Sequence, residues 1–160
     1  MSSKGLSLIE VILYTALIGV LLPIITYFLF FILRIMNTSV IISSVNSQAS
    51  ETINFINQII RNADKITFPL LGESSSSLSL IIFKTGNVTS SITINLDSGK
   101  IKLKEGENTN YLTNSGVAVS GLLFSNVSRG GTAGSIKIQF TIATSTYSKI
   151  FYGSASLREH

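Results

Sequence analysis

The sequence predicts an α+β protein in which one long N-terminal helix packs against an antiparallel β-sheet. Three observations support this prediction. An apolar run extends from Leu6 to Leu33, an apolar stripe at helical spacing follows it, and short alternating segments between turn residues fill the remainder. Hydrophobic residues make up 45% of the 160 residues, and most of the excess lies in the first run. We therefore expect residues 6–34 to form a hydrophobic helix and residues 35–160 a globular head.

The apolar run is long enough to cross a membrane, because about 20 apolar residues span the hydrocarbon core. Lys4 precedes the run and indicates that this side is cytoplasmic, although Arg34 on the far side reduces the charge asymmetry. A secretory signal peptide would have a shorter apolar core with small residues at a cleavage site after it, and no such site follows Leu33. A plain membrane anchor explains every feature except Glu10, because an unpaired carboxylate in an apolar span costs several kcal/mol.

The helix is expected to continue beyond the membrane over residues 35–65. No Pro or Gly interrupts the segment from Arg34 to Lys65. Its apolar residues recur at spacings of three and four, which is typical of a helix with one buried face. They are Ile42, Val45, Ala49, Ile53, Ile56, Ile60 and Ala63. A continuous helix from Leu6 to Asp64 would be about 90 Å long.

Residues 66–160 are expected to form an antiparallel β structure of about six strands. Pro69 and Gly72 end the helical region, and Glu73–Ser77 and Glu105–Asn110 are interpreted as polar loops. The turn Asp97-Ser98-Gly99 between two alternating segments predicts a β-hairpin. The expected strands lie near Leu78–Phe83, Ile92–Leu96, Lys100–Lys104, Val117–Phe124, Ile136–Ile142 and Tyr147–Ala155.

The composition argues against enzyme chemistry. The chain has no cysteine, and its single histidine is His160, which we expect to be a solvated residue. Disulfides, thiolate metal sites and a Ser-His-Asp triad are therefore excluded. We predict no catalytic residue, no metal site and no cofactor, and we expect that the protein is not an enzyme.

A basic hairpin strand is the one surface that suggests nucleic-acid contact. Lys100, Lys102 and Lys104 would lie on one face of a strand, and Arg129 could add a fourth positive charge. Such a surface could contact DNA phosphates. The alternative is a solvated edge strand whose lysines block aggregation, and we favour it because no aromatic residues alternate with the lysines.

The first ten residues carry the most specific pattern. The segment Gly5-Leu6-Ser7-Leu8-Ile9-Glu10, followed by a long apolar helix, resembles the processing motif of the type IV pilin-like family. Leu6 departs from the more usual Phe at that position. The resemblance implies that residues 1–5 are a leader, that a membrane peptidase cuts after Gly5, and that the same enzyme methylates Leu6. It also implies that Glu10 pairs with the N-terminal ammonium of a neighbouring subunit.

Gly19 and Pro23 lie in the middle of the apolar run. A helix-interior Pro removes one backbone hydrogen bond, and Gly loosens the backbone. The resemblance implies that this stretch can melt and extend in an assembled filament. The alternative is that Gly and Pro are simply tolerated, because both are common in transmembrane helices.

The resemblance extends over the whole chain and implies a pilin fold. Head features resemble minor pilins and pseudopilins of the J/W type, namely Leu78-Ser79-Leu80, Ile92–Lys104, Leu112-Thr113 with Leu123-Phe124, and Ala155–Arg158. The implied function is a structural subunit of a type IV pilus-like, type II secretion or competence filament. Two alternatives stay open: a major pilin of the filament shaft, and a membrane-tethered module that binds DNA or a secreted substrate.

The implied partners follow from that function. They are the prepilin peptidase and methylase, other pilins or pseudopilins, an inner-membrane platform protein with its assembly ATPase, and membrane lipid before assembly. The implied location is the cell membrane, as a single-pass protein with its head outside the cytoplasm, and then an extracellular or periplasmic filament. Nucleic acid is a partner that we do not favour.

Overall fold

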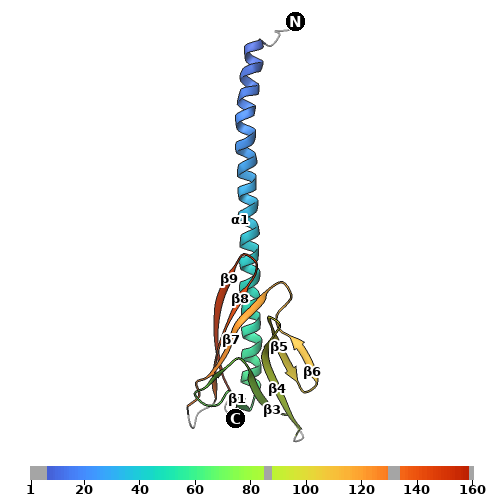
Figure 1. The fold of residues 1–160 in the computed structure, drawn as a ribbon, viewed down its shortest axis with the longest axis vertical. Coiled ribbons are helices and arrows are strands. Elements are labelled where there is room, and N and C mark those ends of the chain that lie inside the picture. Colours follow the sequence, from blue (N-terminus) through green and yellow to red (C-terminus); the bar gives the residue numbers. More distant parts are fainter. Residues whose placement is uncertain (1–6, 85–87, 130–133, 159–160) are drawn as a thin grey trace. The chain divides into compact units, whose positions relative to one another are not determined.

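Figure 1 shows a computed structural model that describes residues 7–84, 88–129 and 134–158. The chain divides into two compact units, an N-terminal unit of Met1–Ile41 and a head unit of Ile42–His160. One helix, α1, runs from Leu8 to Asn62 and contributes to both units. The predicted combination of one long apolar N-terminal helix with antiparallel β-sheets is confirmed.

The N-terminal part of α1 is apolar on all sides. Every residue from Ser7 to Val40 is exposed, and the helix is long and apolar enough to cross a membrane. The helix includes Pro23 and continues past Arg34, as the sequence predicts. A single N-terminal helix with the dimensions of a membrane span is therefore present.

Within the head unit, α1 has one buried face. The buried residues are Val45, Ala49, Thr52, Ile56 and Ile60, and Ala63 is buried just after the helix ends. The predicted apolar stripe is thus confirmed, with Ile42 and Ile53 half-buried at its margins. Thr52 is the one member of the buried face that an apolar pattern could not identify, because it carries a hydroxyl group.

The head unit contains two antiparallel sheets. The five-stranded sheet has the order β1-β3-β4-β5-β6, and the four-stranded sheet has the order β2-β7-β8-β9. The strands of the first sheet are β1 (Lys65–Phe68), β3 (Leu78–Lys84), β4 (Val88–Asp97), β5 (Lys100–Glu105) and β6 (Asn108–Tyr111). Those of the second are β2 (Ser74–Ser75), β7 (Ala118–Asn126), β8 (Ser135–Ala143) and β9 (Ser148–Ser156). They are labelled in Figure 1 where there is room.

Strands β5 and β8 alternate between core and solvent as the sequence predicts. On β8, Ile136, Ile138, Phe140 and Ile142 are buried. Side chains from α1 and from both sheets form one hydrophobic core. The rings of Phe140 and Phe151 stack within it at a centroid distance of 6.1 Å. Alternate burial on β8 therefore fixes which residues of this sheet remain available at its outer face.

The predicted hairpin is confirmed at the β4–β5 turn. Ser98 and Gly99 both have positive φ, at 50° and 74°. Positive φ at both central residues is the requirement of a type I′ turn, which matches the twist of the flanking strands. The pairing of Asp97 with Lys100 follows directly from this two-residue loop.

The helix ends earlier than predicted, at Asn62 instead of Lys65. Lys65 begins β1, which pairs with β3, and the sequence pattern gave no indication of this strand. Asp64 makes the transition: its N–H donates to the carbonyl of Ile81 at 2.9 Å, and its Oδ2 accepts the N–H of Phe83 at 2.7 Å. Pairing with β3 thus competes successfully with another turn of helix.

Two segments predicted to be loops contain strands. Glu73–Ser77 includes β2, and Glu105–Asn110 includes most of β6, so that the described chain has nine strands instead of about six. All four residues of β6 are exposed, so its side chains show no alternation. Only main-chain pairing with β5 defines this strand, after a turn in which Gly106 has a φ of 59°. The pattern of apolar residues cannot detect such a strand.

The helix lies close against β9 at Gly153. A Cβ atom added to Gly153 would lie 2.9 Å from Cγ2 of Ile53, which is closer than real Cβ contacts. Glycine is therefore required at this point of β9 because α1 lies directly against it, and this contact positions the helix beside the edge of the four-stranded sheet.

We predict that Gly153→Ala lowers the free energy of unfolding of the head by about 1–3 kcal/mol, the usual penalty for an overpacked contact. Urea unfolding of a fragment that begins at Arg34 measures this change. Ser154→Ala, on the exposed side of the same strand, should have little effect. In an Ile53→Ala background the penalty of Gly153→Ala should largely disappear, and an equal penalty in both backgrounds would contradict the proposed contact.

Candidate functional site

The exposed apolar surface of α1 is the most unusual feature of the chain. Large apolar side chains cover the helix from Leu8 to Val40, and none of these residues is buried. Soluble monomers rarely expose a continuous apolar patch larger than a few hundred Å². This surface therefore requires lipid or other protein around it.

Glu10 lies in the first turn of that surface, where its N–H donates to the carbonyl of Ser7 at 2.9 Å. Its carboxylate is exposed and has no ion-pair or hydrogen-bond partner among the residues described. The positive end of the helix dipole offers partial compensation. A full compensating charge must come from outside the described part of this chain.

Gly5 and Leu6, the predicted processing site, lie outside the described residues. Gly19 and Pro23 both lie in continuous helix. The predicted melting concerns an assembled filament, and it stays a prediction.

The threonine hydroxyls in the apolar part of α1 donate to carbonyls of their own helix. Thr15 donates to the carbonyl of Val11 at 2.9 Å, and Thr26 donates to that of Leu22 at 2.8 Å. These bonds allow threonine to lie in an apolar span without a partner from another molecule. Polar groups of this segment that do not have such bonds are therefore candidates for contacts with another molecule.

The predicted basic surface on β5 is only partly assembled. Lys100, Lys102 and Lys104 share the outer face of β5, while Ile101 and Leu103 face the core. Arg129 does not join them. The start of β7 lies beside the β4–β5 turn, where the N–H of Val119 donates to the carbonyl of Gly99 at 2.8 Å, whereas Arg129 follows the opposite end of β7.

Lys102 is engaged by an acidic residue on the same surface. Its Nζ lies 3.1 Å from Oδ2 of Asp97, and the hydroxyl of Tyr111 donates to the same oxygen at 3.1 Å. The hydrogen bond from Lys102, helped by that from Tyr111, lowers the pKa of Asp97. The Asp97 carboxylate correspondingly raises the pKa of Lys102. The charge of Lys102 is thus partly compensated by Asp97, which weakens the case for a phosphate-binding surface.

Part of this network was predictable and part was not. The two-residue hairpin makes Lys102 a diagonal neighbour of Asp97, so their contact could have been predicted from the sequence. Tyr111 lies in β6 and pairs with Lys102 of β5. Most of β6 was interpreted as a loop. The Nζ of Lys100 lies 5.7 Å from the centroid of the Tyr111 ring. Because the pairing of β5 with β6 was not predicted, Tyr111 was not expected beside the lysines.

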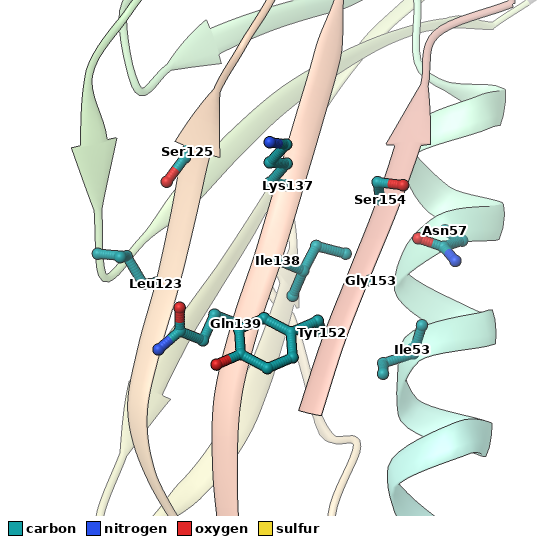
Figure 2. A pocket seen from close by; sticks show the side chains of 10 residues that line it. All are labelled: Ile53, Asn57, Leu123, Ser125, Lys137, Ile138, Gln139, Tyr152, Gly153 and Ser154. Atoms are coloured by element: carbon teal, nitrogen blue, oxygen red, sulfur yellow. The ribbon is translucent and has the colours of Figure 1, made fainter. Parts of the chain in front are cut away.

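A groove of about 760 Å³ lies on the outer face of the four-stranded sheet, next to α1 (Figure 2). Two rows of cross-strand neighbours line it. The first row is Leu123, Gln139 and Tyr152, and the second is Ser125, Lys137 and Ser154. Tyr152 is 68% exposed. The alternating residues of the sequence predict the outward positions on β8, but they do not indicate which strands lie beside it.

The chemistry of the groove suits binding and not catalysis. Its lining contains no carboxylate, histidine or cysteine. It offers one ammonium group, several neutral hydrogen-bonding groups and an aromatic ring, and Oδ1 of Asn57 is buried without a partner in the described structure. Within the residues described, no group of three His, Cys, Asp or Glu side chains could hold a metal ion.

Comparison with protein-family models, with curated proteins and with solved structures found no match to this chain.

We predict that Asp97→Asn destabilises the head in a pH-dependent manner. Because the pKa of Asp97 is lowered on folding, its stabilising effect is present above the unfolded pKa of about 3.9 and is lost as the pH falls through the folded pKa. The urea midpoint of the variant should be below that of the wild type at pH 7, and the two should converge as the pH falls through the folded pKa of Asp97. Glu107→Gln, an exposed change in the next turn, should give no such difference, and a pH-independent effect of Asp97→Asn would contradict the network.

Proposed function

We propose that this chain is a structural subunit of a type IV pilin-like filament, and not an enzyme. In this proposal the leader, residues 1–5, is removed after Gly5, and Leu6 becomes the methylated N-terminus. The apolar part of α1 then holds the protein in the cell membrane with its head outside the cytoplasm. During assembly the same surface packs against the helices of other subunits.

The observation that carries the proposal is the carboxylate of Glu10, which has no partner among the described residues and lies on an otherwise apolar helical surface. The Glu10 carboxylate would not help a helix that serves only as a lipid anchor, because an ionised carboxylate in an apolar span is costly. A neighbouring subunit that begins at Leu6 would supply an ammonium group. At 4 Å and an effective dielectric constant of 20, two unit charges attract by about 4 kcal/mol before desolvation is counted.

Two further features support the proposal. The segment Gly5–Glu10 resembles the prepilin processing motif residue by residue. The layout, one helix that is apolar on all sides at first and then packs one face on antiparallel sheets, is consistent with a pilin-like fold. Minor pilin or pseudopilin is our preferred role, with the prepilin peptidase, other pilins, the platform protein and the assembly ATPase as partners.

The groove beside Tyr152 favours a second role as a membrane-tethered binding module. Its mixed polar and aromatic lining could hold part of a secreted substrate. DNA is less favoured as the ligand of the head, because Asp97 engages Lys102 and Arg129 lies at the other end of β7. This role is compatible with a filament subunit, since the groove lies within the head unit.

We predict that Glu10→Ala leaves membrane insertion and processing intact but removes the protein from filaments. Without the carboxylate the span is more apolar, so insertion should be at least as efficient. The loss of the attraction to Leu6 should reduce incorporation at least tenfold, since a tenfold change needs only about 1.4 kcal/mol. Immunoblots of sheared filaments and of membranes measure the two populations.

Glu10→Gln keeps the size of the side chain and should behave like Glu10→Ala. Glu51→Ala removes an exposed carboxylate from the head part of the same helix and is the matched control, with normal incorporation expected. Normal recovery of Glu10→Ala along the filament shaft would refute the assembly role of Glu10.

A further inference from the structure

Gly19 and Pro23 are the two ends of a single missing hydrogen bond. In an α-helix the N–H of residue i donates to the carbonyl of residue i−4. Pro23 lies inside α1 and has no N–H, so the carbonyl that loses its donor is that of Gly19. The surface at Gly19 is also open, because a Cβ placed there would meet no atom within 4 Å. An acceptor without its normal donor is thus exposed in the middle of an apolar helix.

This carbonyl needs a donor wherever water is absent, because an unsatisfied backbone group in an apolar phase costs several kcal/mol. The hydroxyls of Thr15 and Thr26 are not available, since each donates to a carbonyl of its own helix. The hydroxyls of Tyr14 and Tyr27 have no partner within the part of the chain that the structure describes. These two phenol hydroxyls are therefore able to donate to an acceptor on another molecule.

Tyr14 and Tyr27 differ in the direction in which their side chains extend. Side chains of a helix slant toward its N-terminus. The phenol of Tyr14 is therefore directed toward the nearer, N-terminal end of the span, where it can reach water. The phenol of Tyr27, which is 75% exposed, is directed toward the middle of the span. It cannot reach Gly19 of its own helix, which lies eight residues or about 12 Å away along the axis.

We propose that Tyr27 of one copy donates a hydrogen bond to the Gly19 carbonyl of a neighbouring, parallel copy. This inference rests on the proposed function, because it requires apolar helices of this chain to pack together. Gly19 permits the close backbone approach that such a bond needs. The tyrosine thereby replaces the donor that Pro23 removes.

The register required for this bond agrees with the register that Glu10 requires. When Leu6 of one copy lies level with Glu10 of its neighbour, the two helices are offset by four residues, or about 6 Å. The same offset, in the same direction, brings Tyr27 of that neighbour level with Pro23, where the donor is missing. One axial offset between parallel copies thus suits both the contact of Glu10 with Leu6 and that of Tyr27 with the Gly19 carbonyl.

The test uses the full chain, purified from a host that also makes a prepilin peptidase and reconstituted in neutral bilayers. Energy transfer between dyes attached to the heads gives the dissociation constant for self-association. Tyr27→Phe removes only the hydroxyl and should weaken association by about 3- to 18-fold, which corresponds to the average and the largest effects measured for hydrogen bonds between membrane helices. Tyr14→Phe is the matched control and should change the constant by less than about twofold.

A second variant separates the hydrogen bond from general packing. Pro23→Ala restores the N–H donor to the Gly19 carbonyl within the same helix. In that background Tyr27→Phe should have no effect beyond about twofold, because the acceptor is already occupied. An equal loss in both backgrounds, or no loss from Tyr27→Phe in the wild type, would overturn the inference.

Glu10→Ala in the same assay distinguishes failure of the inference from failure of the proposed function. If Glu10→Ala weakens association and Tyr27→Phe does not, the Tyr27 inference is wrong and the filament proposal stands. If the wild-type chain does not associate, or if neither variant weakens it, both are wrong.

Discussion

One helix has to be stable in two different environments, and the rest of the structure depends on this constraint. From Leu8 to Val40, α1 is exposed and mostly apolar, so this surface requires lipid or other protein around it. From Val45 onward a single face is buried under two antiparallel sheets. The change occurs without a break in the helix. The apolar and the folded parts of the chain are therefore joined by continuous helical backbone instead of a linker.

The polar groups of the N-terminal unit explain why lipid alone is an incomplete environment for it. The described threonines are satisfied by their own helix, but the Glu10 carboxylate, the Gly19 carbonyl and the Tyr27 hydroxyl are not. Each of these groups would be stabilised by a partner on a parallel copy of the same helix. The apolar surface allows insertion, and its few unsatisfied groups favour one axial register during assembly. We regard this division of roles as the physical basis of the proposed filament subunit.

The sequence was sufficient for the features that depend on local pattern. The span, the stripe from Val45 to Ala63 and the type I′ hairpin at Ser98-Gly99 all follow from periodicity or turn chemistry. It was insufficient where main-chain pairing alone defines an element. Strands β1, β2 and β6 are short, and most of their side chains are exposed, so no pattern distinguished them from helix or loop.

The same distinction applies to the candidate sites: those that depend on local sequence were predicted, and those that depend on strand pairing were not. Glu10 was identified from the sequence because a carboxylate in an apolar run is anomalous by itself. The groove beside Tyr152 and the contact of Tyr111 with Asp97 depend on which strands become neighbours. Long-range pairing of this kind is decided by the core as a whole, and so Arg129, at the opposite end of β7, was wrongly expected near the β5 lysines.

The state of the N-terminus in assembled material tests the central claim most directly. Filaments sheared from the source cell, digested and examined by mass spectrometry, should contain this chain with N-methylated Leu6 as its first residue. The membrane fraction should contain a mixture of that form and the form that begins at Met1. A chain that is found only in membranes and retains residues 1–5 throughout would contradict the account.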